Sequence, residues 1–196
     1  ATVNFCSTLN DLVFQKNRVK RLVFADHEVE LSNNDSVILA LPAASINKLL
    51  PDIMTPNLFR PIVNGHFEIP KNPTGLTFLG LINSPAHWIF IRNNIASVTV
   101  SAAVELSNKT NLEVASILWK EVQSALRLGC FPLGNYRIIK ERRATFAQTP
   151  CQSERRPLCA TQYDNLRIAG DWINTGFPAT IEGAVMSGEF AVNNLN

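Results

Sequence analysis

The chain has 196 residues, 46% of them hydrophobic and 17% charged, so it can bury a core and is not a disordered segment. Its 18 basic and 16 acidic residues give a formal net charge of +2, which argues against a nucleic-acid partner, and short basic runs such as Arg155-Arg156 are expected to be solvated or locally paired. Four cysteines without C-x-x-C spacing and three scattered histidines predict no metal site and favour reduced thiols in the cytoplasm.

Residues 11–42 alternate between short apolar runs and polar turns. The runs over residues 12–14, 19–24 and 28–32 have the length and spacing of a β-meander. The next run, residues 37–42, is short, unbroken and apolar, which predicts a strand that is buried on both faces.

The middle of the chain is predicted to contain a sheet. A short helix over residues 44–50 and a loop with Pro51 and Pro56 come first. Strand-like runs separated by prolines and an Asn-Asn pair follow, at residues 62–69, 76–82, 87–91 and 96–101. This pattern predicts an antiparallel sheet.

The clearest helix is predicted over residues 110–128. Thr110 and Glu113 have the T-x-x-E spacing of a capping box, and Gly129 follows as a stop. Apolar residues recur at helical spacing and should face the core: Leu112, Ala115, Leu118, Trp119, Val122, Ala125 and Leu126. A strand over residues 136–146 and a loop with Pro150 and Pro157 come next.

The last part of the chain predicts a ligand crevice. A short apolar strand ends at Gly170-Asp171, and a turn leads into a helix from about residue 178 to 192. A strand end beside a helix N-terminus presents free N–H groups and a positive dipole. Gly183, Ala184 and Gly188 would let a flat ligand approach the helix. In the alternative interpretation, Asp171 only caps a turn and the small residues serve helix packing.

Residues 165–192 contain Gly-Asp-Trp and Thr-Gly-Phe-Pro-Ala-Thr-Ile-Glu-Gly-Ala-Val. This stretch resembles the C-terminal FAD motif of the flavin amine oxidase and phytoene desaturase superfamily, and in its fuller form the hydroxysqualene dehydroxylase family, also called squalene-associated FAD-dependent desaturases. Residues 138–150 and 37–42 resemble, respectively, the strand before that motif and the strand at the domain crossover. The resemblance is strong at the end of the chain and weaker in residues 43–130.

The resemblance implies an α/β fold, namely the C-terminal part of a two-domain FAD oxidoreductase. Residues 1–42 and 161–196 would belong to an incomplete Rossmann-like FAD domain, and residues 43–160 to an antiparallel-sheet substrate domain. It also implies a set of FAD contacts but no catalytic acid or base. Gly170 and Asp171 would meet the ribityl-pyrophosphate part, and the remaining residues would lie near the isoalloxazine or at the crossover: Pro178, Ala179, Thr180, Ile181, Leu41 and Pro42.

A flavoprotein of this kind should also contain G-x-G-x-x-G after its first strand. The nine glycines are all at least five residues apart, so no G-x-G occurs. We therefore expect the N-terminal FAD-binding segment on a lost segment or a separate subunit, and weak FAD binding by this chain alone.

The resemblance favours conversion of hydroxysqualene to squalene, with an isoprenoid lipid as substrate. Such a lipid needs an apolar tunnel, and the aromatic residues of the predicted sheet could line it or form ordinary core: Phe59, Phe67, Phe78, Trp88 and Phe90. A phytoene or carotenoid desaturase, an amine oxidase and a non-catalytic subunit of a split flavoprotein stay open as alternatives. A lipid substrate favours peripheral membrane contact, although no apolar run is long enough for a transmembrane helix.

Overall fold

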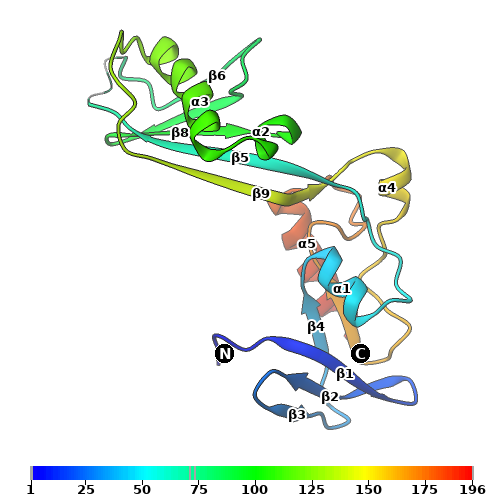
Figure 1. Cartoon of the computed structure of the whole chain (residues 1–196). Coiled ribbons are helices and arrows are strands. Elements are labelled where there is room, and N and C mark those ends of the chain that lie inside the picture. The colour runs from blue at the N-terminus through cyan, green and yellow to red at the C-terminus, as the bar shows by residue number, and fades with distance from the viewer. Residues whose placement is uncertain (1, 71, 73, 196) are drawn as a thin grey trace. The chain divides into compact units, whose positions relative to one another are not determined.

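The computed structural model describes residues 2–70, 72 and 74–195 and divides into two compact units. The first unit comprises Ala1–Leu58 and Phe146–Asn196, and the second comprises Phe59–Thr145. Both units combine helices with strands, and antiparallel sheets occur in each (Figure 1). The predicted α/β class with antiparallel sheets is confirmed.

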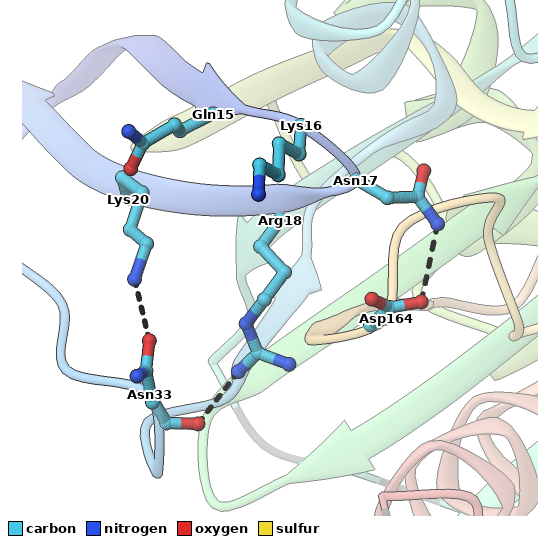
Figure 2. Close-up of a pocket in the computed structure, with 7 residues that line it drawn as sticks. All are labelled: Gln15, Lys16, Asn17, Arg18, Lys20, Asn33 and Asp164. Carbon is cyan, nitrogen blue, oxygen red and sulfur yellow. Dashed lines mark hydrogen bonds between the residues drawn. The ribbon is translucent and has the colours of Figure 1, made fainter.

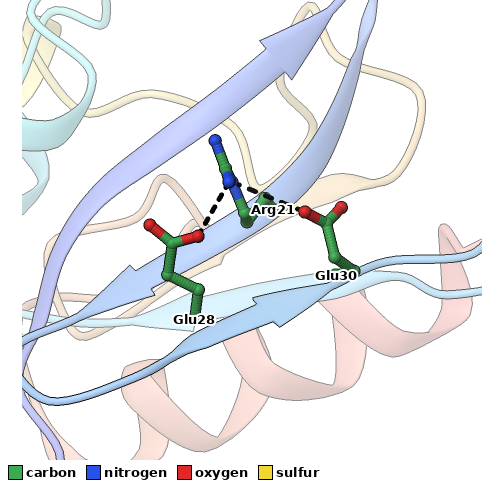
Figure 3. Close-up of polar contacts among 3 residues, drawn as sticks. All are labelled: Arg21, Glu28 and Glu30. Carbon is green, nitrogen blue, oxygen red and sulfur yellow. Dashed lines mark hydrogen bonds and ion pairs between the residues drawn. The ribbon is translucent and has the colours of Figure 1, made fainter.

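The first unit begins with the predicted meander. Strands β1 (Leu9–Gln15), β2 (Arg18–Phe24) and β3 (Glu28–Glu30) pair antiparallel in that order. Arg21 on β2 bridges two carboxylates on β3, with Glu28 at 2.7 Å and Glu30 at 3.6 Å (Figure 3). All three side chains are at least 36% exposed, so these ion pairs contribute at most about 1 kcal/mol each.

The second sheet of this unit joins segments that are distant in sequence. Strands β4 (Val37–Ala40) and β10 (Leu166–Ala169) pair parallel, and helix α5 (Ile181–Asn193) contacts both. All of β10 is buried, whereas β4 alternates between buried residues and the half-buried Ile38 or exposed Ala40. The prediction that the β4 segment is buried on both faces is therefore wrong. Within the described residues β4 has one strand neighbour, so its other edge is unpaired there.

A buried asparagine fastens the meander to the start of β10. The Asn165 side chain is 1% exposed, accepts a hydrogen bond from the Val19 N–H at 2.9 Å and donates to the Val19 carbonyl at 2.9 Å. It also donates to the Asp35 carbonyl at 3.3 Å. Every polar atom of this amide has a partner, which is the condition for burying it without loss of stability.

Two short helices lie near the unit boundaries in the sequence. Helix α1 (Ala43–Leu49) matches the predicted helix closely, whereas α4 (Pro150–Glu154) lies where a loop was expected. Pro150 opens α4, where its fixed φ suits a first helical position. The Gln152 side chain then accepts the N–H groups of Asn57 and Leu58 at 2.8 and 3.1 Å.

These contacts set the unit boundaries. Because Gln152 holds residues 57 and 58, and the Ala147 N–H donates to the Leu58 carbonyl, residues 43–58 and 146–160 pack with the first unit. The compact units thus divide at 58/59 and 145/146, which differs from the sequence-based division at 42/43 and 160/161.

The second unit is a five-stranded sheet covered by a helix on one face. The strand order is β6-β7-β8-β5-β9, with antiparallel pairing of β6 with β7, β7 with β8, and β8 with β5. Its strands are β5 (Phe59–Glu68), β6 (Phe78–Gly80), β7 (Trp88–Arg92), β8 (Ile95–Val100) and β9 (Tyr136–Phe146). The short helix α2 (Val104–Asn108), which was not predicted, leads from β8 into α3 (Asn111–Leu126).

Helix α3 confirms the sequence prediction in most details. Thr110 caps it by accepting the Glu113 N–H at 3.2 Å, and the Glu113 carboxylate accepts the Thr110 N–H at 2.7 Å. Its apolar stripe packs on the sheet within one core cluster, through Val114, Ala115, Leu118, Trp119, Val122 and Leu126. Leu112 is 61% exposed and does not belong to the stripe, because it lies on the first turn facing away from the sheet.

We expect Thr110→Ala to lower the unfolding free energy by about 1 kcal/mol, because it leaves the Glu113 N–H without its capping acceptor. Equilibrium urea unfolding followed by circular dichroism measures this loss. The control is Thr77→Ala, since Thr77 is also exposed but lies outside the helices and strands. Equal midpoints for the two variants would contradict the capping role.

Candidate functional site

The carboxyl ends of β4 and β10 meet at one edge of the parallel pair. Ala169 pairs with Ala40, so Leu41-Pro42 and Gly170-Asp171 leave the sheet at the same level. The indole Nε1–H of Trp172 donates to the Leu41 carbonyl at 2.9 Å and joins the two strand ends. The structure therefore brings together four residues that the sequence analysis assigned to one site.

Helix α5 is attached to the same edge through Ser187. The Gly170 N–H donates to the Ser187 Oγ at 2.8 Å, and that hydroxyl donates to the Ala184 carbonyl at 2.6 Å. Ser187 is fully buried, so this link fixes the helix against the end of β10. A Ser in a helix interior gave no sequence signal of this contact.

The helix begins later than predicted. Thr180 has extended backbone and acts as the N-cap, accepting the Gly183 N–H at 3.2 Å, so α5 starts at Ile181 and not near Pro178. Pro178 and Ala179 lie in the preceding loop. The first-turn N–H groups of Ile181 and Glu182 have no carbonyl within reach inside the helix, as at any helix start. These groups and the helix dipole favour a ligand edge rich in acceptors.

Two glycines are required by the turn itself. Gly170 has φ of +154°, and a Cβ there would lie 2.4 Å from Trp172 Nε1. A Cβ at Gly183 would lie 2.7 Å from the Pro178 carbonyl oxygen. Of the two helix glycines in the packing interpretation, a Cβ would therefore be blocked at Gly183, whereas at Gly188 it would meet open space.

Arg156 organises the turn between β10 and α5, a role that the sequence did not predict. Its guanidinium donates to the carbonyls of Trp172 at 3.3 Å, Phe177 at 2.8 Å and Asp171 at 3.3 Å. It also donates to the Ile173 carbonyl. Partial burial lowers the pKa of Arg156, and the charge of Asp171 opposes that shift. The expectation that Arg155-Arg156 is a solvated or charge-paired cluster is wrong for Arg156, because backbone carbonyls surround its guanidinium.

Asp171 is partly buried at the end of β10. Burial raises the pKa of its carboxyl group above the ordinary value. The backbone N–H groups of Asp171 and Trp172 and the charge of Arg156 act in the opposite direction. A carboxylate held in this way can accept hydrogen bonds from ligand hydroxyls at the end of β10.

Apolar side chains surround the start of α5 without being covered. Phe177, Ile181 and Val185 are 43%, 87% and 54% exposed. An exposed apolar group of this kind beside polar backbone donors fits a flat, partly polar ring system better than water. The residues of the candidate site are thus compatible with a flavin.

The aromatic residues of the second unit divide between two faces of its sheet. Phe67 is fully buried under α3, with its ring centroid 5.6 Å from that of Trp119. Phe78, Trp88 and Phe90 lie on the opposite face and are 61%, 46% and 49% exposed. Phe59 is half-buried. Phe67 is therefore ordinary core, and the three exposed aromatics form a separate group, which we call the open face.

Hydrogen-bonded polar pairs lie beside the aromatics of the open face. His66 and Ser97 are hydrogen-bonded at 2.9 Å, and the Thr99 hydroxyl donates to Asn64 at 2.7 Å. The strand register places Ser97 opposite Phe90. The face thus combines stacked rings with hydroxyl and amide groups.

Within the described ranges, no group of three or more His, Cys, Asp or Glu side chains is placed to hold a metal ion. No helix in that part of the chain is both long and apolar enough to cross a bilayer.

Comparisons with known proteins agree with this geometry. The profile of the family described as flavin containing amine oxidoreductase matches residues 1–196. The hydroxysqualene dehydroxylases of Zymomonas mobilis and Rhodopseudomonas palustris are 37% and 38% identical over 97% of this chain. The chain spans 46% of each relative, about half its length. A solved oxidoreductase from Methanosarcina mazei superposes with a TM-score of 0.69 at 12% identity, over 95% of this chain and 49% of that one, which shows the fold alone.

Proposed function

We propose that this chain, which belongs to the flavin containing amine oxidoreductase family, supplies the C-terminal half of an FAD-dependent isoprenoid oxidoreductase. The proposed reaction is conversion of hydroxysqualene to squalene. The observation that carries this proposal is the 37% identity to a hydroxysqualene dehydroxylase over 97% of the chain. The predictions of an oxidoreductase and of an FAD cofactor are confirmed at the level of the family.

The cofactor contacts are proposed from the site at the ends of β4 and β10. Gly170 and Asp171 would bind the ribityl-pyrophosphate part of FAD, with Leu41 and Pro42 at the crossover beside them. Residues 178–181 would lie near the isoalloxazine, where the free N–H groups of the helix start could stabilise negative charge on the reduced ring. Replacing a carbon-bound hydroxyl by hydrogen consumes two electrons and two protons and releases water; a bound flavin would supply the electrons only in its reduced form, after an external reductant has delivered two electrons to it.

The open face supports a lipid substrate. The open face exposes three large aromatic side chains, those of Phe78, Trp88 and Phe90. A contiguous exposed apolar patch of this kind is typical of a binding surface. The neighbouring His66–Ser97 and Asn64–Thr99 pairs offer hydrogen-bonding groups for a substrate hydroxyl. This combination suits an isoprenoid chain that bears a hydroxyl group. Such a substrate also favours peripheral contact with a membrane.

We further propose that the complementary half of the enzyme completes the FAD site. The relatives are about twice as long as this chain, and β4 has one strand neighbour within the described residues. A strand supplied by the other half would pair with β4, and G-x-G-x-x-G on that half would hold the ADP part.

The test is a chimera in which this chain replaces the matching segment of the Zymomonas mobilis hydroxysqualene dehydroxylase. We expect the chimera to retain one FAD per molecule and to form squalene from hydroxysqualene when a reductant is supplied. The isolated chain should lose FAD on gel filtration. A flavin-loaded chimera that forms no squalene would contradict the substrate, and tight FAD retention by the isolated chain would contradict the incomplete site. Desaturation of phytoene by the chimera would favour a carotenoid desaturase.

A further inference from the structure

We propose that the tip of the β1–β2 hairpin carries a binding site for a phosphate group, separate from the flavin site. A cavity of about 430 Å³ opens between the hairpin and the loops around Asn33 and Asp164. Three cationic side chains line it, namely Lys16, Arg18 and Lys20 (Figure 2). This site does not rest on the function proposed above.

Strand geometry explains why the three cations converge. Arg18 and Lys20 are two residues apart on β2, so their side chains leave the same face of the strand. Lys16 joins them from the turn, where its φ is +55°. Arg21 points to the other face, where it is engaged by carboxylates of β3. The charges that line the cavity are therefore not those that pair within the meander.

The partners of these cations within the cavity are neutral. The Arg18 Nη2 donates to the Asn33 carbonyl at 2.8 Å, and the Lys20 Nζ donates to the Asn33 Oδ1 at 2.6 Å. The Arg18 Nε is buried and has no hydrogen-bond partner in the part of the chain that the structure describes. A buried guanidinium nitrogen without an acceptor is rare in folded proteins. Because the Arg18 charge is met by the neutral Asn33 carbonyl, the guanidinium would attract an oxyanion in the cavity.

One carboxylate lies at the rim of the cavity. Asp164 accepts a hydrogen bond from the Asn17 amide at 3.1 Å, and its charge offsets one of the three cations. An excess of two positive charges remains, which matches a phosphate dianion better than a carboxylate. Because the cations gather around one cavity and do not form a long stripe, the site fits a single phosphate group. That group can belong to a small phosphorylated molecule or to a lipid headgroup.

Binding of inorganic phosphate and of vesicles tests these two sources separately. Phosphate is titrated into the full chain by calorimetry at fixed ionic strength, and vesicles of phosphatidylcholine with or without phosphatidic acid are tested by co-sedimentation. We expect Lys16→Gln with Lys20→Gln to weaken binding by about tenfold, because a close cation contributes on the order of one charge-assisted hydrogen bond. The matched control is Lys48→Gln with Lys120→Gln, which removes the same charge from exposed positions outside the cavity.

A second variant is expected to change the phosphate affinity in the opposite direction. Asp164→Asn should tighten binding by about threefold or more, because it removes the repulsive carboxylate and can keep an acceptor for Asn17. Binding of phosphate alone would identify a small phosphorylated ligand, and binding of phosphatidic acid vesicles alone would identify a headgroup. Either result supports the site. No binding of either probe, or equal binding by the cavity and control variants, would overturn it.

Discussion

Replacement of Arg156 by methionine is expected to lower the unfolding free energy by about 3 kcal/mol and to abolish FAD retention by the chimera. One guanidinium holds four backbone carbonyls of the turn between β10 and α5. A hydrogen bond to a charged group contributes about 1.5–3 kcal/mol, and partial exposure of Arg156 reduces the sum. Without it, the turn loses the contacts that join the Asp171 carbonyl to that of Phe177, shortly before the helix.

Urea unfolding of the chain and flavin absorbance of the purified chimera measure the two effects. Arg156→Lys keeps the charge but loses the planar fork, so we expect it to lie between wild type and Arg156→Met. Arg21→Met is the matched control, since it removes an exposed ion-paired arginine of the same unit and should change stability by less than about 1 kcal/mol. If Arg156→Met and Arg21→Met unfold at the same urea concentration, the proposed role of Arg156 is wrong.

The sequence predicted best where a pattern is long and local. The capping box and apolar stripe fixed α3 to within two residues, and the strand over residues 136–146 matches β9 in full. Helices α2 and α4 were not predicted, because five residues are too few for a helical period to stand out. Short helices depend on tertiary contacts, such as those of Gln152 with Asn57 and Leu58. Contacts between segments that are distant in sequence leave no local pattern.

The motif located the candidate site, but it did not predict the residues that hold the site in place. Gly170 and Asp171 meet the end of β4 because two distant strands pair in register, and α5 is attached there through Ser187. Arg156 lies well before the turn that it holds, and all its partners there are backbone carbonyls, which carry no residue-specific signal. A pair of adjacent arginines in sequence therefore looks the same whether it is solvated or buried.

The aromatic residues show that predicting a strand does not predict which face of the sheet is covered. Strand-like runs separated by prolines and an Asn-Asn pair predicted the strands, but which face receives α3 is set by packing across the sheet. Phe67 lies on that face, whereas Trp88 and Phe90 alternate with the buried Ile89 and point the other way. Gly80, opposite Trp88, leaves room for the indole, since a Cβ there would lie 3.2 Å from its ring.

Asp171→Asn is expected to stabilise the chain while weakening FAD binding. Burial raises the pKa of Asp171 in the folded state, so at neutral pH the folded protein carries a carboxylate that is less stable there than in the unfolded chain. This penalty is absent below the unfolded pKa and grows as the pH rises through the interval up to the folded pKa. Asparagine removes the charge, so we expect the variant to have a higher Tm than the wild type at pH 7.

The same substitution removes a charged acceptor for the ligand hydroxyls of the proposed FAD site. Loss of one hydrogen bond to a charged group should raise the Kd for FAD about tenfold to a hundredfold in the chimera. Thermal melts from pH 3 to pH 8 on the isolated chain test the first effect, and the two proteins should converge at the acid end. Fluorescence titration of the chimera with FAD tests the second. Because a purely structural aspartate would move stability and cofactor affinity in the same direction, opposite signs would distinguish a ligand-binding Asp171 from one that only caps the turn.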